Sequence, residues 1–357
     1  MRYSRGLLVA SILLASAAIT ASREAHSAPA LWSERGISLG LFAEDPGLDY
    51  GYLLREIRAT GATHVSVVVP YYQHDVRSTE LRAHSRYTPP LDRVLRTLSQ
   101  ARALGLRVLL FPILRLEYEV TPDEWRGALA PQDPDAWWRN YRKLILELAQ
   151  VAARGGAESF CVGSELSSLD TRPARWAPLI AEVRRTFRGR LVYSANHDHF
   201  ERVAIWHLVD QIGLSAYFEL VGLAERQPSL LRLTHAWREL RSRIGRFWAR
   251  VRKPIVLTEL GYHSQRGTSA RPWFESLKEP LGLDEQRDCY AAFRRAFAGA
   301  PYLEGVYFWN WFGWGGPQSR EYCPRGKPAA REICQAFGVA PARCPSTHGM
   351  PWYDPRR

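Results

Sequence analysis

Several signatures of large enzyme classes are missing from this chain of 357 residues. It contains no glycine-rich phosphate loop and no nicotinamide fingerprint, so we expect no nucleotide cofactor, and the chemistry proposed below requires no other cofactor. It also lacks the Gly-x-Ser-x-Gly elbow of many serine hydrolases, because the Gly163-Ser164-Glu165 segment has no second glycine. A serine nucleophile is therefore disfavoured.

Cysteine is scarce, and none of the five cysteines forms a Cys-x-x-Cys pair. The spacing therefore gives no support to a zinc site. Cys323, Cys334 and Cys344 lie close together near the C-terminus, where an oxidising compartment would permit a disulfide. Cys161 falls in an apolar run and is expected to be a buried small hydrophobe. The pairing among the three C-terminal cysteines and Cys289 stays open, and the odd total leaves at least one thiol free or paired between chains.

Lysine is also rare, since only four of the 48 basic residues are lysine, and the formal net charge is +12. The arginines are scattered over the chain and not gathered in one basic segment, so we expect no nucleic-acid partner. A surplus of positive charge is compatible with attraction to anionic polymers of a cell envelope. The sequence gives no indication of oligomeric state.

Long apolar runs are confined to the N-terminus. Two arginines precede an apolar run over residues 7–19, and a short Ala-His-Ser segment ending at Ser27 offers a cleavage site. We interpret residues 1–27 as a secretory signal peptide, with an uncleaved membrane anchor as the alternative, because the run is shorter than the roughly 20 residues that span a bilayer. The mature chain is expected to be secreted or periplasmic and to have no membrane span.

Short apolar runs alternate with longer amphipathic segments, which is the pattern of repeated βα units. The predicted strands cover residues 36–42, 64–71, 107–114, 159–163, 190–194, 211–216, 255–260 and 305–310. The predicted helices cover residues 50–59, 91–104, 135–154, 174–187, 230–250, 283–298 and 328–337, and Gly61, Gly105, Gly156 and Gly189 are expected to end helices. We therefore predict an α/β fold, a (β/α)8 TIM barrel, as a single domain over 31–340 with enlarged βα loops and a C-terminal tail over 341–357.

Two glutamates occupy equivalent places in this pattern. Glu165 lies just past the fourth predicted strand and Glu259 lies near the end of the seventh. The carboxyl ends of barrel strands form the active-site face, and a carboxylate at the tip of an apolar strand is costly to bury without a function or a partner. Glycoside hydrolysis uses two such carboxyl groups flanking the scissile bond. The alternative for each glutamate is a structural ion pair with one of the arginines.

Six short segments occur in an order that covers most of the chain from the first strand to the last helix. They are Val-Gly-Ser-Glu-Leu at 162–166, Tyr-Ser-Ala-Asn-His at 193–197, Ile-Gly-Leu-Ser-Ala-Tyr-Phe at 212–218, Lys-Pro-Ile-Val-Leu-Thr-Glu-Leu-Gly-Tyr at 253–262, Phe-Trp-Asn-Trp at 308–311 and Gly-Lys-Pro-Ala at 326–329. As a set, they resemble glycoside hydrolase family 113, a family of the clan A (β/α)8 glycosidases.

The resemblance implies a mechanism and a substrate. Glu165 would be the acid/base and Glu259 the nucleophile of a retaining β-glycoside hydrolase, and Tyr217 would donate a hydrogen bond to the nucleophile. The expected substrate is a β-1,4-linked mannan or manno-oligosaccharide. Ser164 stands where many clan A enzymes have an asparagine that contacts the sugar 2-hydroxyl. In this chain the shorter serine side chain would have to make that contact.

Other residues after the predicted strands are candidates for binding sugar, because aromatic faces stack on sugar rings and polar groups orient the hydroxyls. They are Trp309, Trp311, Trp314, Asn196, His197 and Tyr262. Tyr71 could line a distant subsite. His197-Asp198-His199 resembles a metal cluster, but further ligands at ligand spacing are missing, so no metal is expected. Trp137 and Trp138 fall in a predicted helix and are expected to pack in the core.

Two other readings of the same residues stay open. Within the enzyme class, the substrate could be another β-glycan or an envelope polysaccharide. In a different class, the chain could be a non-catalytic carbohydrate-binding barrel, in which aromatic side chains hold sugar but no bond is broken. The presence of both Glu165 and Glu259 weighs against that second reading.

Overall fold

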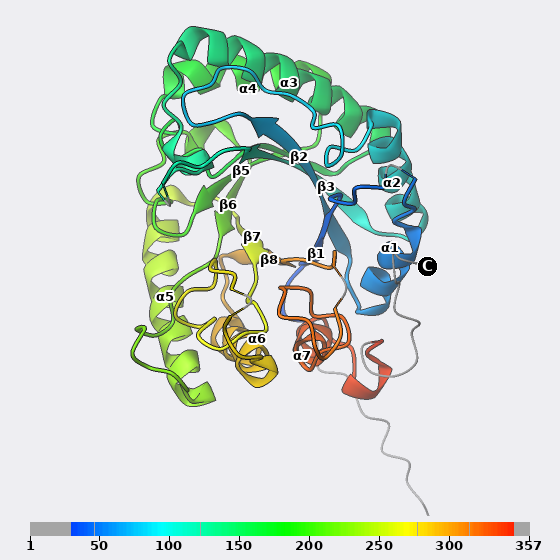
Figure 1. Cartoon of the computed structure of the whole chain (residues 1–357), viewed down its shortest axis with the longest axis vertical. Helices are drawn as coiled ribbons and strands as arrows, with labels where there is room; N and C mark the ends of the chain where they lie inside the picture. The colour runs from blue at the N-terminus through cyan, green and yellow to red at the C-terminus, as the bar shows by residue number, and fades with distance from the viewer. Residues whose placement is uncertain (1–29, 46, 122, 277, 314, 346–357) are drawn as a thin grey trace, which may run out of the picture.

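The computed structural model describes residues 30–45, 47–121, 123–276, 278–313 and 315–345. The predicted signal peptide, Trp314 and residues 346–357 of the predicted tail therefore lie outside the described residues. Eight parallel strands form a closed barrel in chain order, and β1 (Glu34–Gly40) completes the ring by pairing with β8 (Leu303–Phe308). Figure 1 shows this ring of strands with the helices around its outside. The predicted (β/α)8 barrel is confirmed.

The predicted elements agree with the observed ones to within two residues at each end. The other strands are β2 (His64–Gln73), β3 (Arg107–Leu116), β4 (Ser159–Ser164), β5 (Arg190–Asn196), β6 (Gln211–Ser215) and β7 (Ile255–Leu260). The helices are α1 (Gly51–Ala59), α2 (Leu91–Ala103), α3 (Pro134–Gly155), α4 (Pro173–Thr186), α5 (Leu230–Val251), α6 (Leu283–Phe297) and α7 (Ala329–Ala336). The connection from β5 to β6 contains only a short 3-10 turn, η2 (Trp206–Leu208).

Three of the four glycines predicted to end helices do so with left-handed backbone. Gly61, Gly105 and Gly156 follow α1, α2 and α3 with φ of +90°, +75° and +65°, values that favour glycine. The prediction was wrong for Gly189, because α4 ends in the extended backbone of Phe187. Gly189 is needed for a close approach instead, since a Cβ there would lie 2.4 Å from the carbonyl oxygen of Glu158.

The core has two layers, as expected for a barrel whose strands are covered on both faces. A small cluster that includes Phe111, Cys161 and Tyr307 fills the barrel interior, and a much larger cluster packs between the strands and the helices. Trp137 and Trp138 are buried in the outer layer, as predicted.

The amino-terminal end of the barrel is closed by a buried carboxylate. Glu34 accepts hydrogen bonds from Gln211 Nε2 at 2.7 Å and from the Tyr307 hydroxyl at 3.0 Å, and Arg190 Nη1 lies 3.1 Å from its Oε1. Burial raises the pKa of Glu34, and these three partners oppose that shift. Because catalytic groups of TIM barrels lie at the opposite end, we assign this network to stability.

The C-terminal segment is fixed by a disulfide between Cys334 in α7 and Cys344, which follows the 3-10 turn η3 (Pro341–Arg343). Cys161, Cys289 and Cys323 are free and buried. The pairing that the sequence left open is therefore Cys334 with Cys344. None of the helices in the described ranges is both long enough and apolar enough to cross a membrane.

Candidate active site

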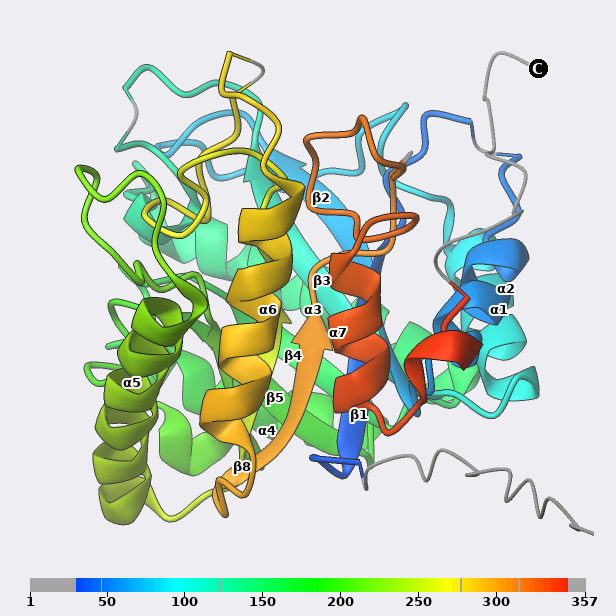
Figure 2. The ribbon, with the colours of Figure 1, turned by 90° about the horizontal axis from the view of Figure 1, so that it is seen from below.

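The loops that follow the strands gather at the carboxyl end of the barrel, above the arrowheads in Figure 2. Glu165 directly follows β4, and Glu259 is the fifth residue of β7. Hydrogen bonds to the neighbouring strands fix both backbones, because Glu165 N donates to Ser194 O and Ala216 N donates to Glu259 O, each at 2.7 Å. Both side chains are buried. The barrel thus brings the two predicted catalytic glutamates to the same end of the molecule.

Glu165 has an unusual backbone. Its φ is +57°, in the left-handed region, and Arg252 is the only other non-glycine residue of the described ranges with positive φ. Bulky residues reach this region at an energetic cost, which folded proteins tend to carry at functional sites. The turn ends the extended run of β4 at the residue that bears the carboxyl group.

Glu259 has one partnered and one unpartnered oxygen. The Tyr217 hydroxyl donates to Glu259 Oε2 at 2.9 Å, which is the contact predicted for this tyrosine. The other oxygen, Oε1, is buried and has no hydrogen-bond partner among the described residues. Burial, followed by the charge of Glu165, raises the pKa of Glu259 to about 8, while Arg126 and Tyr217 act in the opposite direction. Burial beside a second carboxyl group therefore favours the neutral form of Glu259.

Arg126 is a third charged group at this site, and we did not predict it. It begins the turn η1 (Arg126–Ala128) in the β3–α3 loop, and its Nη2 donates to Glu165 Oε2. Two hydrogen bonds from Ser168, to Gly127 O at 3.0 Å and Leu129 O at 2.7 Å, tie this turn to the segment after Glu165. Although burial opposes its charge, the carboxylates of Glu165 and Glu259 raise the pKa of Arg126. The guanidinium of Arg126 therefore offsets negative charge that the buried carboxyl pair would otherwise carry alone.

Hydroxyl groups lie on the strands between the two glutamates. Ser194 Oγ is 2.5 Å from Thr258 Oγ1 and 3.2 Å from Ser215 Oγ, so these three side chains satisfy one another. Ser164 Oγ is buried without a partner among the described residues. A predicted contact between Ser164 and a sugar hydroxyl stays a prediction.

The comparison with known families identifies this arrangement. The sequence model described as Glycoside Hydrolase Family 113 matches residues 51–320, which include β2 to β8 and both glutamates. The chain belongs to glycoside hydrolase family 113. It is therefore a glycoside hydrolase, and its substrate is a carbohydrate.

Solved structures agree with the barrel of this family 113 glycosidase. A GH113 β-mannanase from Alicyclobacillus acidocaldarius is 26% identical, with a TM-score of 0.76 over 86% of this chain and 97% of that one. A GH113 β-1,4-mannanase is 23% identical, with a TM-score of 0.76 over 86% and 99% of the two chains. A β-glucuronidase from Dictyoglomus thermophilum shares the fold at 15% identity, with a TM-score of 0.60, over 86% of this chain and 50% of that one. None of the curated proteins compared matches this chain.

Of the tryptophans at the end of β8 in this glycosidase, Trp309 is the better placed to meet a sugar. It is half-buried, its ring lies 6.3 Å from that of Phe42, and its amide donates to Leu260 O of β7 at 2.8 Å. The prediction for Trp311 was wrong, because its ring is buried and its Nε1 donates to Glu56 Oε2 of α1 at 2.9 Å. The side chain is therefore committed to packing against α1.

Tyr262 is a second correction. Its side chain is fully buried, and its ring lies 5.6 Å from that of Tyr290 in α6. It belongs to the layer between strands and helices, so a sugar at the barrel mouth cannot reach it.

Asn196 and His197 remain near the glutamates, with Asn196 partnered locally. Asn196 Oδ1 accepts from His197 N at 3.0 Å and lies 2.9 Å from His197 Nδ1, while Asn196 Nδ2 donates to Asp198 Oδ1 at 3.0 Å. Contacts of either residue with sugar stay predictions. His199 pairs with Asp170 at 2.9 Å. Within the described ranges, no group of three His, Cys, Asp or Glu side chains is arranged to hold a metal ion.

Two buried cations hold the β8–α7 loop that carries Trp309. Arg325 donates to Glu56 of α1 through Nε at 2.6 Å and Nη2 at 2.8 Å. Lys327 Nζ donates to Ser264 Oγ after β7 and to Glu321 O, each at 2.8 Å. Burial lowers the pKa of Lys327 to about 8. The loop is thus attached on one side to α1 and on the other to the end of β7.

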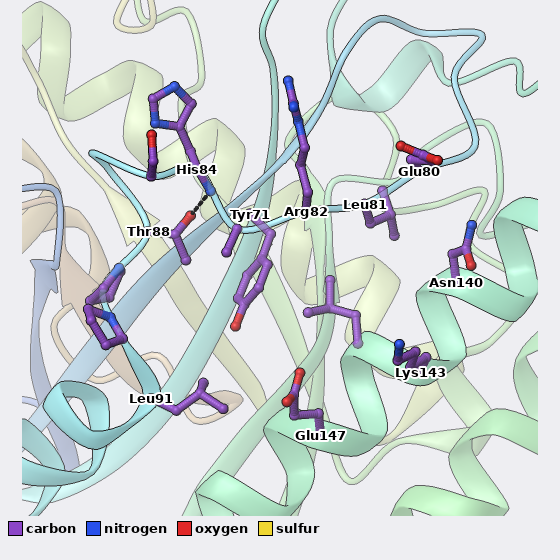
Figure 3. A pocket seen from close by; sticks show the side chains of 15 residues that line it. Tyr71, Glu80, Leu81, Arg82, His84, Thr88, Leu91, Asn140, Lys143 and Glu147 are labelled. Carbon is purple, nitrogen blue, oxygen red and sulfur yellow. Dashed lines mark hydrogen bonds between the residues drawn. The ribbon is translucent and has the colours of Figure 1, made fainter.

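A separate pocket of about 600 Å³ lies between β2, the β2–α2 loop and α3 (Figure 3). Its lining includes Tyr71, His84, Lys143 and Glu147, but neither catalytic glutamate. Tyr71 therefore faces this pocket, and its place in a distant sugar subsite stays a prediction.

Proposed function

We propose that this family 113 enzyme is a retaining β-glycoside hydrolase that cleaves β-1,4-linked mannan or manno-oligosaccharides. The observation that carries the proposal is the pair of buried glutamates at the ends of β4 and β7, with Tyr217 hydrogen-bonded to Glu259. The substrate assignment rests on the family and on the two mannanases with the same fold.

The first step is displacement of the leaving group. Glu259 attacks the anomeric carbon, and its unpartnered Oε1 is the oxygen free to form the new bond. Glu165 gives a proton to the glycosidic oxygen as that carbon–oxygen bond breaks, which leaves Glu165 ionised. Because Arg126 already donates to Glu165 Oε2, it is positioned to stabilise the carboxylate formed in this step.

The second step hydrolyses the glycosyl-enzyme. Glu165 takes a proton from water, the water oxygen attacks the anomeric carbon, and Glu259 leaves as a carboxylate. Two inversions give net retention of configuration. Before each turnover Glu165 must be protonated and Glu259 ionised, although the resting structure places Arg126 against Glu165 and burial raises the pKa of Glu259. We propose that the bound sugar shifts this balance, because the positive charge that develops at the anomeric carbon favours the ionised form of Glu259.

The enzyme is further proposed to act outside the cytoplasm, in the medium or the periplasm. The predicted signal peptide and the Cys334–Cys344 disulfide both support this localisation. Cell fractionation of the natural host with an antibody against the mature chain would test it, and recovery of the protein in the cytoplasm would contradict it.

The test of the function is release of reducing sugar from purified mannans, glucans, xylans and galactans by residues 28–357, beside Glu165→Ala and Glu259→Ala. The remote variant Glu239→Ala on α5, where the side chain is 69% exposed, is the control. Activity on mannan that is lost in both site variants supports the proposal. Proton NMR of the first product distinguishes retention from inversion. Cleavage of another glycan alone would replace the substrate, and an inverted product would overturn the mechanism.

A further inference from the structure

The two glutamates divide the mouth of the barrel into two arcs. Since the strands follow one another in chain order around the ring, a line from β4 to β7 has β5 and β6 on one side and β8, β1, β2 and β3 on the other. A glycan whose scissile bond lies between the two carboxyl groups must cross this line. It therefore places its glycone on one arc and its leaving-group sugars on the other.

Trp309 provides an aromatic platform for sugar on one of the two arcs only. It follows β8, beside the strand that carries Glu259, and so suits the sugar that is attacked. Our sequence predictions placed no aromatic platform on the arc of β5 and β6. The leaving-group sugar must lie close to Glu165, because its oxygen receives the proton from that residue.

Trp273 lies on the arc of β5 and β6. It belongs to the β7–α6 loop and is 46% exposed, a large fraction for an indole. Its ring stacks on that of His197, which follows β5, with centroids 5.5 Å apart and an interplanar angle of 23°. His197 covers one part of the indole, and much of the remaining aromatic surface is open to solvent. An exposed, flat aromatic supported from behind is the usual form of a sugar-stacking platform.

A second set of contacts connects the loop of Trp273 to the catalytic pair. The Tyr322 hydroxyl donates at 2.7 Å to the carbonyl oxygen of Pro272, the residue before Trp273. The Tyr322 ring lies 6.0 Å from that of Tyr217, whose hydroxyl donates to Glu259. The loop that bears Trp273 is thus connected to the nucleophile through two side chains, and the indole is supported by His197, which follows β5.

We infer that Trp273 forms the sugar-stacking platform of the leaving-group subsite, and that His197 holds the indole in place. The inference rests on the proposed function and extends it, because it assigns the sugars on the two sides of the scissile bond to different tryptophans. The platform binds a pyranose ring of the leaving group and does not touch the reacting carbon. Trp273 is therefore a binding residue and not a catalytic one.

The test compares two substrates with different leaving groups. Cleavage of β-1,4-mannopentaose releases a sugar as the leaving group. Cleavage of β-mannobiosyl fluoride releases fluoride, which has no ring to stack on an indole. For Trp273→Ala we expect kcat/KM on mannopentaose to fall about fivefold to tenfold, chiefly through a higher KM, with little change on the fluoride. Trp273→Phe should recover part of the loss. Phe274→Ala is the matched control for damage to the loop, since Arg271 covers that ring at 4.1 Å.

Equal losses on both substrates would show a structural effect on the catalytic pair and overturn the inference, as would unchanged kinetics on mannopentaose. If the wild type cleaves neither substrate, the proposed mannanase function has failed. The platform is then tested by calorimetric titration of mannopentaose, cellopentaose and xylopentaose into the wild type and Trp273→Ala. Weaker binding of one pentaose by the variant supports the platform, whereas equal binding, or no binding to the wild type, overturns it.

Discussion

The Tyr217 hydroxyl lies 2.9 Å from Glu259 Oε2 and donates a hydrogen bond to it. This donor stabilises the ionised carboxylate and lowers its pKa against the larger effect of burial. In Tyr217→Phe we expect kcat to fall about tenfold to a hundredfold, the value of one hydrogen bond to a charged group. The acidic limb of the pH–rate profile should move to higher pH. Tyr302→Phe is the control, because its hydroxyl donates to the backbone carbonyl of Arg241 and the residue precedes β8, at the opposite end of the barrel. An unshifted limb would argue against Glu259 as the titrating base.

Arg126 is expected to influence both carboxyl groups. It donates to Glu165 and lowers the pKa of Glu259, so Arg126→Gln should raise the pKa of Glu259 further and move the acidic limb upwards. We expect kcat/KM to fall at least about tenfold, because one charge-assisted contact in a buried site is lost. Arg126→Lys should restore the position of the acidic limb more fully than kcat/KM, since lysine keeps the charge but not the planar geometry of the guanidinium. A profile identical to that of the wild type in Arg126→Gln would contradict this role.

Glu259 should lower the stability of the folded enzyme as pH rises. Its folded pKa is raised from 4.5 to about 8, so between these values the folded state holds a proton that the unfolded state releases. The free energy of unfolding therefore decreases as pH rises through this window. Glu259→Gln removes the titration, and we expect it to be more stable than the wild type by about 2 to 4 kcal/mol at pH 8. Urea unfolding at pH 5 and pH 8 measures the difference, with Glu239→Gln as the surface control. A constant difference at both values would show that Glu259 is not the linked group.

Lys327 should contribute most to stability at high pH. Its folded pKa is lowered from 10.5 to about 8, so the stability it provides is present above 10.5 and is lost as pH falls through 8. Lys327→Met leaves Ser264 Oγ and Glu321 O without this donor, which should cost about 1 to 3 kcal/mol. Chemical denaturation at pH 7 and pH 10 should show the larger loss at pH 10. A larger loss at pH 7 would indicate that Lys327 acts as a buried charge and not as a donor.

The opposite end of the barrel offers a stability test that should not affect catalysis. Glu34→Ala removes the acceptor of Gln211 and Tyr307, and we expect a loss of about 1 to 3 kcal/mol in the free energy of unfolding. Glu34→Gln should lose less, because burial already favours the neutral form of this side chain. Values of kcat measured well below the melting temperature should match the wild type in both variants. A changed kcat would mean that the amino-terminal end is coupled to the site.

The sequence predicts the barrel well because each strand and helix can be recognised from a short local pattern of residues. Strands of a parallel barrel are buried on both faces, so each appears as a short apolar run, and all eight were located to within two residues. The same rule places Glu165 and Glu259 at strand ends and leads to the pair of carboxyl groups. Gly189 was predicted incorrectly because the sequence does not distinguish a glycine required for close packing from a glycine that ends a helix.

The rest of the site depends on loops, where the direction of a side chain does not follow from the sequence. Trp309 and Trp311 are two residues apart and would share a face in a continued strand, yet the chain leaves β8 at Phe308 and Trp311 turns to Glu56 of α1. Arg126 and Trp273 lie in long loops among many arginines and aromatics, so no pattern separated them from their neighbours. Their position follows from contacts with Glu165 and His197 that exist only in the folded chain.

The closure of the ring between β1 and β8 has a consequence for how the enzyme is made. Glu34 pairs with Gly305 in the finished ring, so one edge of β1 stays unsatisfied until β8 has left the ribosome. Unpaired strand edges are prone to intermolecular pairing, and long-range contacts form slowly. Nascent or truncated chains that end before Leu303 should therefore need chaperones to stay unaggregated, because only β8 gives the first strand its second neighbour.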